Sequence, residues 1–106
     1  EKITGNSVIT PTTAATWGNA IYLQSKQTAV QNNCVVPAST HDNAIKVMGG
    51  GCVLDGNEIR VGGGSAATGS AIRLQNSGNV CLNTKTNGTV VDGGTNTVSG
   101  TTTITA

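Results

Sequence analysis

Apolar and polar residues alternate along short segments of this chain, and the segments recur at a nearly constant spacing. Three of them share an Ala-Ile-x-aliphatic pattern and begin 24 (44 − 20) and 27 (71 − 44) residues apart. An alternation with period two is typical of β-strands, and no apolar stripe with the 3.6-residue period of an α-helix accompanies it. The pattern therefore predicts a repeat of short strands. The three segments are Ala20-Ile21-Tyr22-Leu23, Ala44-Ile45-Lys46-Val47 and Ala71-Ile72-Arg73-Leu74.

A second block recurs at a similar spacing and is centred on an asparagine. An aliphatic residue stands three positions before each asparagine, and Val or Ile stands two positions after the first three, whereas Lys85 breaks the pattern in the fourth. Units of the repeat therefore start near residues 3, 30, 54 and 80, and a shorter fifth unit starts near residue 98. The asparagines are Asn6, Asn33, Asn57 and Asn83, at steps of 27 (33 − 6), 24 (57 − 33) and 26 (83 − 57) residues.

Two independent registers that agree favour a solenoid, in which each unit stacks on the next and the strands pair in parallel. We therefore predict that residues 1–106 form a single all-β domain, a right-handed parallel β-helix of about four to five coils with an asparagine ladder. Each strand position should give one inward stack of aliphatic side chains. The expected stacks are Ile3/Val30/Leu54/Val80, Val8/Val35/Ile59, Ile21/Ile45/Ile72 and Leu23/Val47/Leu74.

The four asparagines fall at a predicted turn between two strands. Asparagine tolerates the left-handed backbone conformation that a sharp corner needs. Stacked side-chain amides can also donate hydrogen bonds to one another, as in cross-β asparagine ladders. We therefore expect Asn6, Asn33, Asn57 and Asn83 to form a structural ladder along one corner.

The unit aliphatic-x-x-Asn-x-aliphatic covers about residues 3 to 85 and resembles the repeat of the pectin-lyase-like right-handed β-helix family. The resemblance implies the architecture. It does not choose an activity, because that family includes pectate lyases, polygalacturonases, phage tailspikes and surface adhesins.

Composition limits both the core and the partners of the chain. Phe is absent and Trp and Tyr occur once each, so the core must be aliphatic. Six Lys or Arg against five Asp or Glu give a net charge of +1, which argues against nucleic acid, since its binding needs clustered positive charge. No apolar run approaches the roughly 20 residues that span a bilayer, so we expect no membrane partner. No signal peptide precedes Glu1, and in a secreted protein that segment would already have been removed.

The repeat also predicts which polar and aromatic residues gather on one side. Counting back three positions from each alanine of the first pattern gives Trp17, His41 and Thr68, so the single Trp and the single His should be neighbours in adjacent coils. The position after each isoleucine should form an outward column. An indole and a phenol beside cations can bind an anionic sugar or a peptide. The predicted binding patch comprises Trp17, Tyr22, His41, Asp42, Lys46 and Arg73.

Catalysis would need further groups. A glycosidase requires two carboxylates about 5 to 9.5 Å apart, and Asp55 and Glu58 flank the same corner, so their side chains should diverge. A lyase needs a base beside a cation, and Lys46 and Arg73 offer such a pair with His41 nearby. We predict no catalytic residue, no cofactor and no metal site. A polysaccharide lyase or hydrolase acting on acidic glycans is the alternative.

Two further motifs concern covalent chemistry. Cys34, Cys52 and Cys81 occupy different positions relative to their asparagines, so no two should stack within the Cα separation that a disulfide needs. We expect buried or incidental thiols. Asn87-Gly88-Thr89 matches the acceptor sequence for N-glycosylation, which matters in a eukaryotic secretory host.

The ends of the repeat suggest its context. Natural solenoids cover their terminal coils, and no amphipathic capping helix is visible at either end. We expect either a longer β-helix or neighbouring subunits as the caps. The leading hypothesis is a non-catalytic module of a phage-tailspike-like or adhesin-like protein, extracellular, at the cell surface or on a virion. It would act as a rigid spacer with a surface for a polysaccharide or receptor. A self-assembling structural fibre subunit is a further alternative.

Overall fold

The computed structural model describes residues 2–9, 17–24, 26–36, 41–60 and 70–104. Within these ranges the chain forms fourteen strands and no helix, which confirms the predicted all-β class. No helix long and apolar enough to cross a membrane occurs in these ranges. Many of the strand residues are Val, Ile or Thr, whose branched side chains favour extended backbone.

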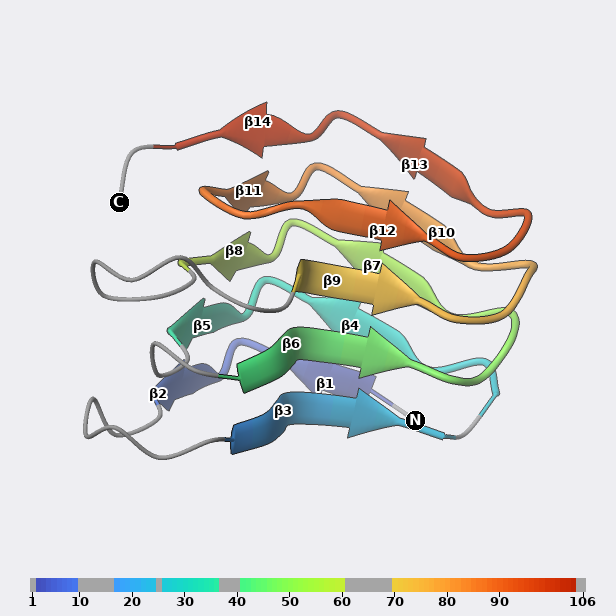
Figure 1. Ribbon diagram of the computed structural model, residues 1–106, viewed down its shortest axis with the longest axis horizontal. Coiled ribbons are helices and arrows are strands. Elements are labelled where there is room, and N and C mark those ends of the chain that lie inside the picture. Colours follow the sequence, from blue (N-terminus) through green and yellow to red (C-terminus); the bar gives the residue numbers. More distant parts are fainter. Residues whose placement is uncertain (1, 10–16, 25, 37–40, 61–69, 105–106) are drawn as a thin grey trace.

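The fourteen strands form three parallel sheets, and each sheet takes every third strand of the chain (Figure 1). Sheet A contains β1 (Lys2–Thr4), β4 (Ala29–Gln31), β7 (Val53–Asp55), β10 (Val80–Leu82) and β13 (Thr97–Ser99). Sheet B contains β2 (Ser7–Ile9), β5 (Cys34–Val36), β8 (Glu58–Ile59), β11 (Lys85–Thr86) and β14 (Thr102–Thr103). Sheet C contains β3 (Trp17–Leu23), β6 (His41–Val47), β9 (Ser70–Leu74) and β12 (Val90–Asp92).

One passage through sheets A, B and C is called a coil below. Each strand of a coil pairs with the corresponding strand of the previous coil. Every described strand pairing is parallel. The predicted starting points at residues 3, 30, 54, 80 and 98 all lie in strands of sheet A. The described part of the fifth coil consists of β13 and β14.

The register of sheet A confirms part of the first predicted stack and corrects the rest. Ile3, Val30 and Leu54 are direct partners in neighbouring strands. In the fourth coil, however, Leu54 is paired with Cys81 and not with Val80. Cys81 is buried and Val80 is half-buried on the outer face. The prediction of Val80 was wrong by one residue, and such a shift moves a strand residue to the opposite face of the sheet.

The other predicted stacks agree with the register. In sheet B, Val8, Val35 and Ile59 are successive partners, and the buried Thr86 takes the next position while Lys85 is exposed. In sheet C, each isoleucine of the Ala-Ile pattern pairs with the next, and Val90 in β12 extends this stack. The two stacks of sheet C are Ile21, Ile45, Ile72 and Val90, and Leu23, Val47 and Leu74.

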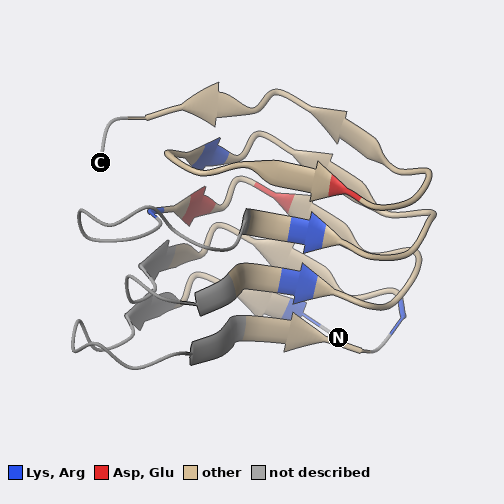
Figure 2. Cartoon of the chain, in the orientation of Figure 1, with Lys and Arg blue, Asp and Glu red and all other residues tan. Residues whose placement is uncertain are grey.

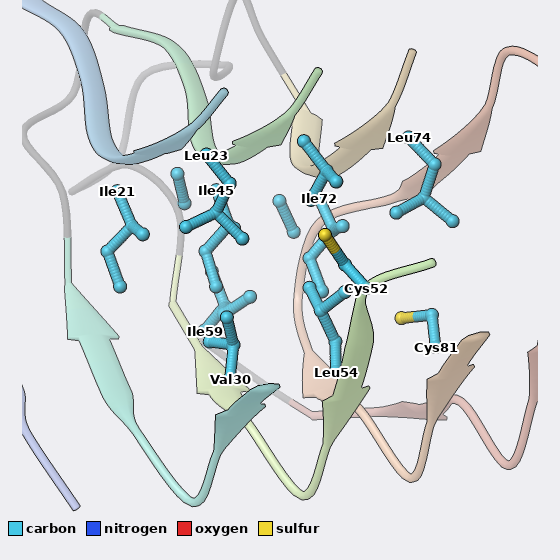
Figure 3. Packing of buried hydrophobic residues seen from close by; sticks show 13 residues of the cluster. Ile21, Leu23, Val30, Ile45, Cys52, Leu54, Ile59, Ile72, Leu74 and Cys81 are labelled. Atoms are coloured by element: carbon cyan, nitrogen blue, oxygen red, sulfur yellow. The ribbon is translucent and has the colours of Figure 1, made fainter. Parts of the chain in front are cut away.

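These stacks meet in one continuous core between the three sheets (Figure 3). Among the residues whose burial the structure describes, thirteen hydrophobic residues form it, and all of them are aliphatic residues or cysteines. Burial of one Leu, Ile or Val side chain stabilises a fold by about 1.5–3 kcal/mol. Because each side chain packs on its counterparts above and below, the core depends on the register between coils.

Asparagine amides link the first three coils at the corner between sheets A and B. Asn33 accepts hydrogen bonds at Oδ1 from the backbone N (2.9 Å) and from Nδ2 (3.1 Å) of Asn6. Asn57 accepts at Oδ1 from the same two atoms of Asn33, at 3.2 and 3.1 Å. Nδ2 of Asn33 also donates to the carbonyl of Ile3 (2.9 Å), and Nδ2 of Asn57 to that of Val30 (3.0 Å). The expected ladder is therefore present in these coils.

Asn83 does not continue this ladder, so its assignment as a ladder residue was wrong. The pairing of β8 with β11 places Thr84, which is buried, in register with Asn57. Asn83 is exposed, and its Nδ2 donates to Oδ1 of Asp55 at 3.0 Å. The physical reason is the same one-residue shift that brings Cys81 into the core.

The left-handed conformation that we expected for the ladder asparagines belongs to the residue before the ladder position. Asn6, Asn33 and Asn57 have no positive φ, so this expectation was wrong for them. The preceding residue is a glycine in three coils and an asparagine in two, with φ between 53° and 71°. These residues are Gly5, Asn32, Gly56, Asn83 and Gly100.

A second polar column, which the sequence analysis did not predict, lies at the corner between sheets C and A. Asn79 accepts at Oδ1 from the backbone N of Cys52 (2.9 Å), and its Nδ2 donates to the carbonyl of Gly49 (3.2 Å). Asn96 accepts in turn from the backbone N of Asn79 at 2.9 Å. This bonding repeats that of the first ladder. In the second coil the column is occupied by Thr28, whose buried Oγ1 has no hydrogen-bond partner among the described residues.

We expect the substitution Asn57→Ala to lower the free energy of unfolding by about 2–4 kcal/mol. It leaves the buried backbone N–H of Asn33 without its acceptor, which costs about 1–3 kcal/mol, and it removes the hydrogen bond to the carbonyl of Val30, which contributes about 1 kcal/mol. Asn6→Ala is the matched control: it removes an exposed ladder residue and should cost about 1 kcal/mol or less. Urea unfolding of the two variants measures the difference. Equal losses would show that the ladder does not contribute through burial.

The turn before the ladder gives a second prediction. Alanine at Gly56 would combine a positive φ of 70° with a Cβ 2.6 Å from Oδ1 of Asn32, whereas alanine at Gly5 would meet nothing within 4 Å at a φ of 66°. Gly5→Ala should therefore cost about 1–2 kcal/mol for the left-handed backbone alone, and Gly56→Ala more. In an Asn32→Gly background the extra cost of Gly56→Ala should disappear. Urea unfolding of the four variants checks this, and an extra cost that persisted would place its origin elsewhere.

Candidate binding surface

The outer face of sheet C carries a column of aromatic and cationic side chains. Tyr22, Lys46 and Arg73 are direct register partners in β3, β6 and β9, as the sequence predicted. They alternate with the inward isoleucines and leucines of the same strands, so their side chains lie on the outside. Figure 2 shows the two cations one above the other on β6 and β9. Parallel strands lie about 4.8 Å apart, so successive side chains leave the sheet at that interval.

The three side chains form a local set. Nζ of Lys46 lies 6.0 Å from the ring centroid of Tyr22, within the range of a cation–π contact. Tyr22 is 47% exposed, so about half of the residue is open to solvent. Nε of Arg73 donates to Oε1 of Gln75 at 3.1 Å, which orients the guanidinium group. The column therefore presents an aromatic face, an ammonium group and a guanidinium group in a row.

Neither cation of the column is neutralised by a carboxylate in the part of the chain that the structure describes. The one ion pair found there joins Arg60 and Glu58 at 2.6 Å, and Glu58 lies in β8 of sheet B. Lys46 and Arg73 are half-buried. A solvent-accessible cation without an internal carboxylate can pair with an external anion, and Arg binds carboxylates through two parallel hydrogen bonds. The column is therefore suited to a ligand that carries negative charge.

The other members of the predicted patch lie in the same sheet but at the opposite ends of its strands. Trp17 and His41 are register partners, so the expected pairing of the single Trp with the single His holds for the backbone. Trp17 stands five residues before Tyr22, which corresponds to roughly 16 Å along an extended strand. The side chains of Trp17, His41 and Asp42, and the whole of Thr68, lie outside what the structure describes.

The upper boundary of the column could not be placed from the sequence. In β12, Val91 is the partner of Arg73, so the polar row gives way to an aliphatic residue. The exposed Asp92 follows, and its Oδ1 accepts hydrogen bonds from Nδ2 of Asn96 (2.6 Å) and from the backbone N of Gly94 (3.1 Å). The Asn96 side chain, followed by the backbone N–H groups of Gly94 and Asn96, lowers the pKa of Asp92 below its ordinary value of 3.8. Asp92 is therefore an anion at neutral pH.

The other acids whose side chains the structure describes are not near the column. Asp55 lies in β7 of sheet A, and Glu58 lies in β8 of sheet B. Asp55 accepts a hydrogen bond from Asn83, and Glu58 is paired with Arg60. Among the described residues, no group of three or more His, Cys, Asp or Glu side chains could hold a metal ion.

None of the three cysteines is in a disulfide, in agreement with the prediction. Cys52 and Cys81 are buried, and Cys34 is half-buried. Burial raises the pKa of the Cys81 thiol, while its hydrogen bond with the Thr84 hydroxyl (3.4 Å) acts in the opposite direction. A buried thiol with a raised pKa is a poor nucleophile.

Comparison of the chain with protein-family models, curated proteins and solved structures gives no match. The candidate site is therefore defined by the geometry of sheet C.

The lowered pKa of Asp92 leads to a test of pH dependence. A carboxyl whose pKa is lower in the folded chain stabilises the fold above its unfolded pKa, and this contribution is lost as the pH falls through the folded pKa. The stability of the wild type relative to Asp92→Asn should therefore decrease from neutral pH to about pH 2. Urea unfolding at a series of pH values measures this difference. A difference independent of pH would contradict the role of the Asn96 contact.

Proposed function

We propose that this chain is a right-handed parallel β-helix of the pectin-lyase-like type that acts as a rigid, non-catalytic module with a binding surface for an acidic glycan. The order of strands in the three sheets supports the architecture, because each sheet gains one strand per coil in parallel register. We place the module outside the cell, on a cell surface or a virion, where acidic polysaccharides occur. A tailspike-like or adhesin-like protein would contain it.

The packing supports the role of a rigid spacer. Adjacent coils share a continuous aliphatic core, and side-chain ladders join many of them at two corners. In such a repeat each coil contacts only its neighbours, so the module is a stiff column whose outward positions lie outside the aliphatic core. Outward residues can then serve recognition at little cost to stability.

The single observation that carries the binding proposal is the in-register column of Tyr22, Lys46 and Arg73. A linear polyuronate presents one carboxylate per sugar, and the apolar face of a sugar ring packs well on an aromatic side chain. Lys46 and Arg73 would each pair with a carboxylate, and Tyr22 would hold a sugar ring. The carboxylates of the ligand would replace the internal partners that both cations lack among the described residues.

A lyase would use the same two cations, one as a base and one to neutralise the substrate carboxylate. We favour binding because Asp92, the one acid of sheet C whose side chain the structure describes, has a lowered pKa and is unsuited to donate a proton at neutral pH. Asp55 and Glu58 belong to other sheets and have partners there. A lyase would release unsaturated products from a polyuronate, which ultraviolet absorbance detects.

We expect the double variant Lys46→Gln/Arg73→Gln to bind immobilised polygalacturonate at least about tenfold more weakly than the wild type at low salt, since two charge-assisted hydrogen bonds are lost. The matched control is Lys2→Gln/Lys85→Gln, which removes the same charge from exposed residues of sheets A and B and should change binding by less than about twofold. Tyr22→Ala should weaken retention at both low and high salt, because stacking is not screened. Surface plasmon resonance measures all three.

Three results would contradict the proposal. The wild type could fail to bind polygalacturonate, the two double variants could lose binding equally, or unsaturated products could accumulate during the measurement. The second result would indicate attraction by net charge without a defined site.

A further inference from the structure

The shortest connection between sheets B and C is a three-residue turn, Asn87-Gly88-Thr89, which joins β11 to β12. Its backbone is held at two points. The N–H of Gly88 donates to Oγ1 of Thr86 at 2.9 Å, and the carbonyl of Thr89 accepts from the N of Ala71 (2.9 Å) and, more weakly, from the N of Ile72 (3.3 Å). The turn is thus a defined part of the surface.

We propose that Asn87 is an acceptor site for an N-linked oligosaccharide. Asn-Gly-Thr is an Asn-x-Thr acceptor sequence without proline in the middle position, and no other Asn-x-Ser or Asn-x-Thr sequence occurs in the chain. The donor would be a lipid-linked oligosaccharide pyrophosphate. Nδ2 of Asn87 forms a bond to C1 of the first sugar, the bond between C1 and the pyrophosphate oxygen breaks, and a proton leaves Nδ2 while the lipid pyrophosphate departs.

The location of the turn is compatible with a bulky modification. The inward positions on its two sides are the buried Thr86 and the partly buried Val90, so the three turn residues lie between two core positions and outside the inward stacks. Thr89, whose hydroxyl the acceptor sequence requires, is exposed. Gly88 has no side chain that would obstruct access to Asn87 or Thr89. By contrast, the amides of Asn33 and Asn57 are buried in the ladder.

This site goes beyond the proposed function and is independent of the column on sheet C. It requires only that the chain enters a secretory compartment that carries out oligosaccharide transfer. A glycan at Asn87 would lie at the start of β12, beside the upper boundary of sheet C. The outcome of a glycosylation assay therefore does not depend on whether sheet C binds a polyuronate.

The test is translation of the full chain behind a cleavable signal segment in the presence of endoplasmic-reticulum microsomes. We expect the protease-protected chain to gain the mass of one oligosaccharide, which an N-glycan amidase removes. Asn87→Gln and Thr89→Val should abolish the gain, while Thr89→Ser should retain it. Asn96→Gln is the matched control, because it changes a nearby asparagine that is not followed by an acceptor sequence, and it should leave the gain unchanged.

A protected wild-type chain without added mass would overturn the proposal, as would a mass gain that persists in Asn87→Gln. The folded state provides a second readout. The glycosylated chain and the amidase-treated chain should unfold cooperatively at the same urea concentration, because the acceptor lies outside the core. Loss of cooperative unfolding in the glycosylated chain alone would show that the turn does not accommodate a glycan.

Discussion

The constraint on which the rest of the structure depends is the register between neighbouring coils. Strands of two or three residues form few backbone hydrogen bonds, so a pair of such strands alone would be unstable. Stability comes from repetition. Each inward aliphatic packs on its counterparts, and Asn33 and Asn57 each accept hydrogen bonds from both the backbone N and the side-chain amide of the asparagine in the preceding coil. This register aligns the donors and acceptors of the buried amides in neighbouring coils. A shifted pairing would break most of these hydrogen bonds and leave polar groups unsatisfied in the core.

The same register creates the candidate site. Ile45 lies inward between Ile21 and Ile72, and the residue after each isoleucine must then lie outward in a column. Tyr22, Lys46 and Arg73 are neighbours for this reason, although they are far apart in the sequence. A shift of one residue in β6 would bring Lys46 into the core, where an unpaired ammonium group is very costly. Core packing therefore fixes the spacing of the surface groups.

The sequence predicted the features that repeat with the same residue types and failed where the types change. The Ala-Ile pattern located sheet C and its outward column because all three copies are alike. In the fourth coil, Val80, Cys81 and Leu82 are all apolar, so the alternation does not fix which of them faces inward, and the presence of Asn83 favoured the wrong choice. The second corner was not predicted because Thr28, Cys52 and Asn79 share no residue type. The contacts of Asp92 depend on a turn whose geometry no repeat encodes.

The fourth coil has no asparagine at the ladder position and still pairs with the third coil. Oγ1 of Thr84 interacts with Cys81 in its own coil, so among the described residues the buried amide ladder ends at Asn57. The exposed Asn83 beside it still donates to Asp55 of the third coil. Backbone pairing nevertheless continues, since the N of Lys85 donates to the carbonyl of Asn57 at 3.0 Å. At this corner, parallel backbone pairing thus continues without the buried amides, while the second polar column supplies side-chain bonds to the fourth and fifth coils through Asn79 and Asn96. A repeat built in this way can vary its outward residues and its B-to-C turns independently, and both the cation column and the Asn87 turn occupy such positions.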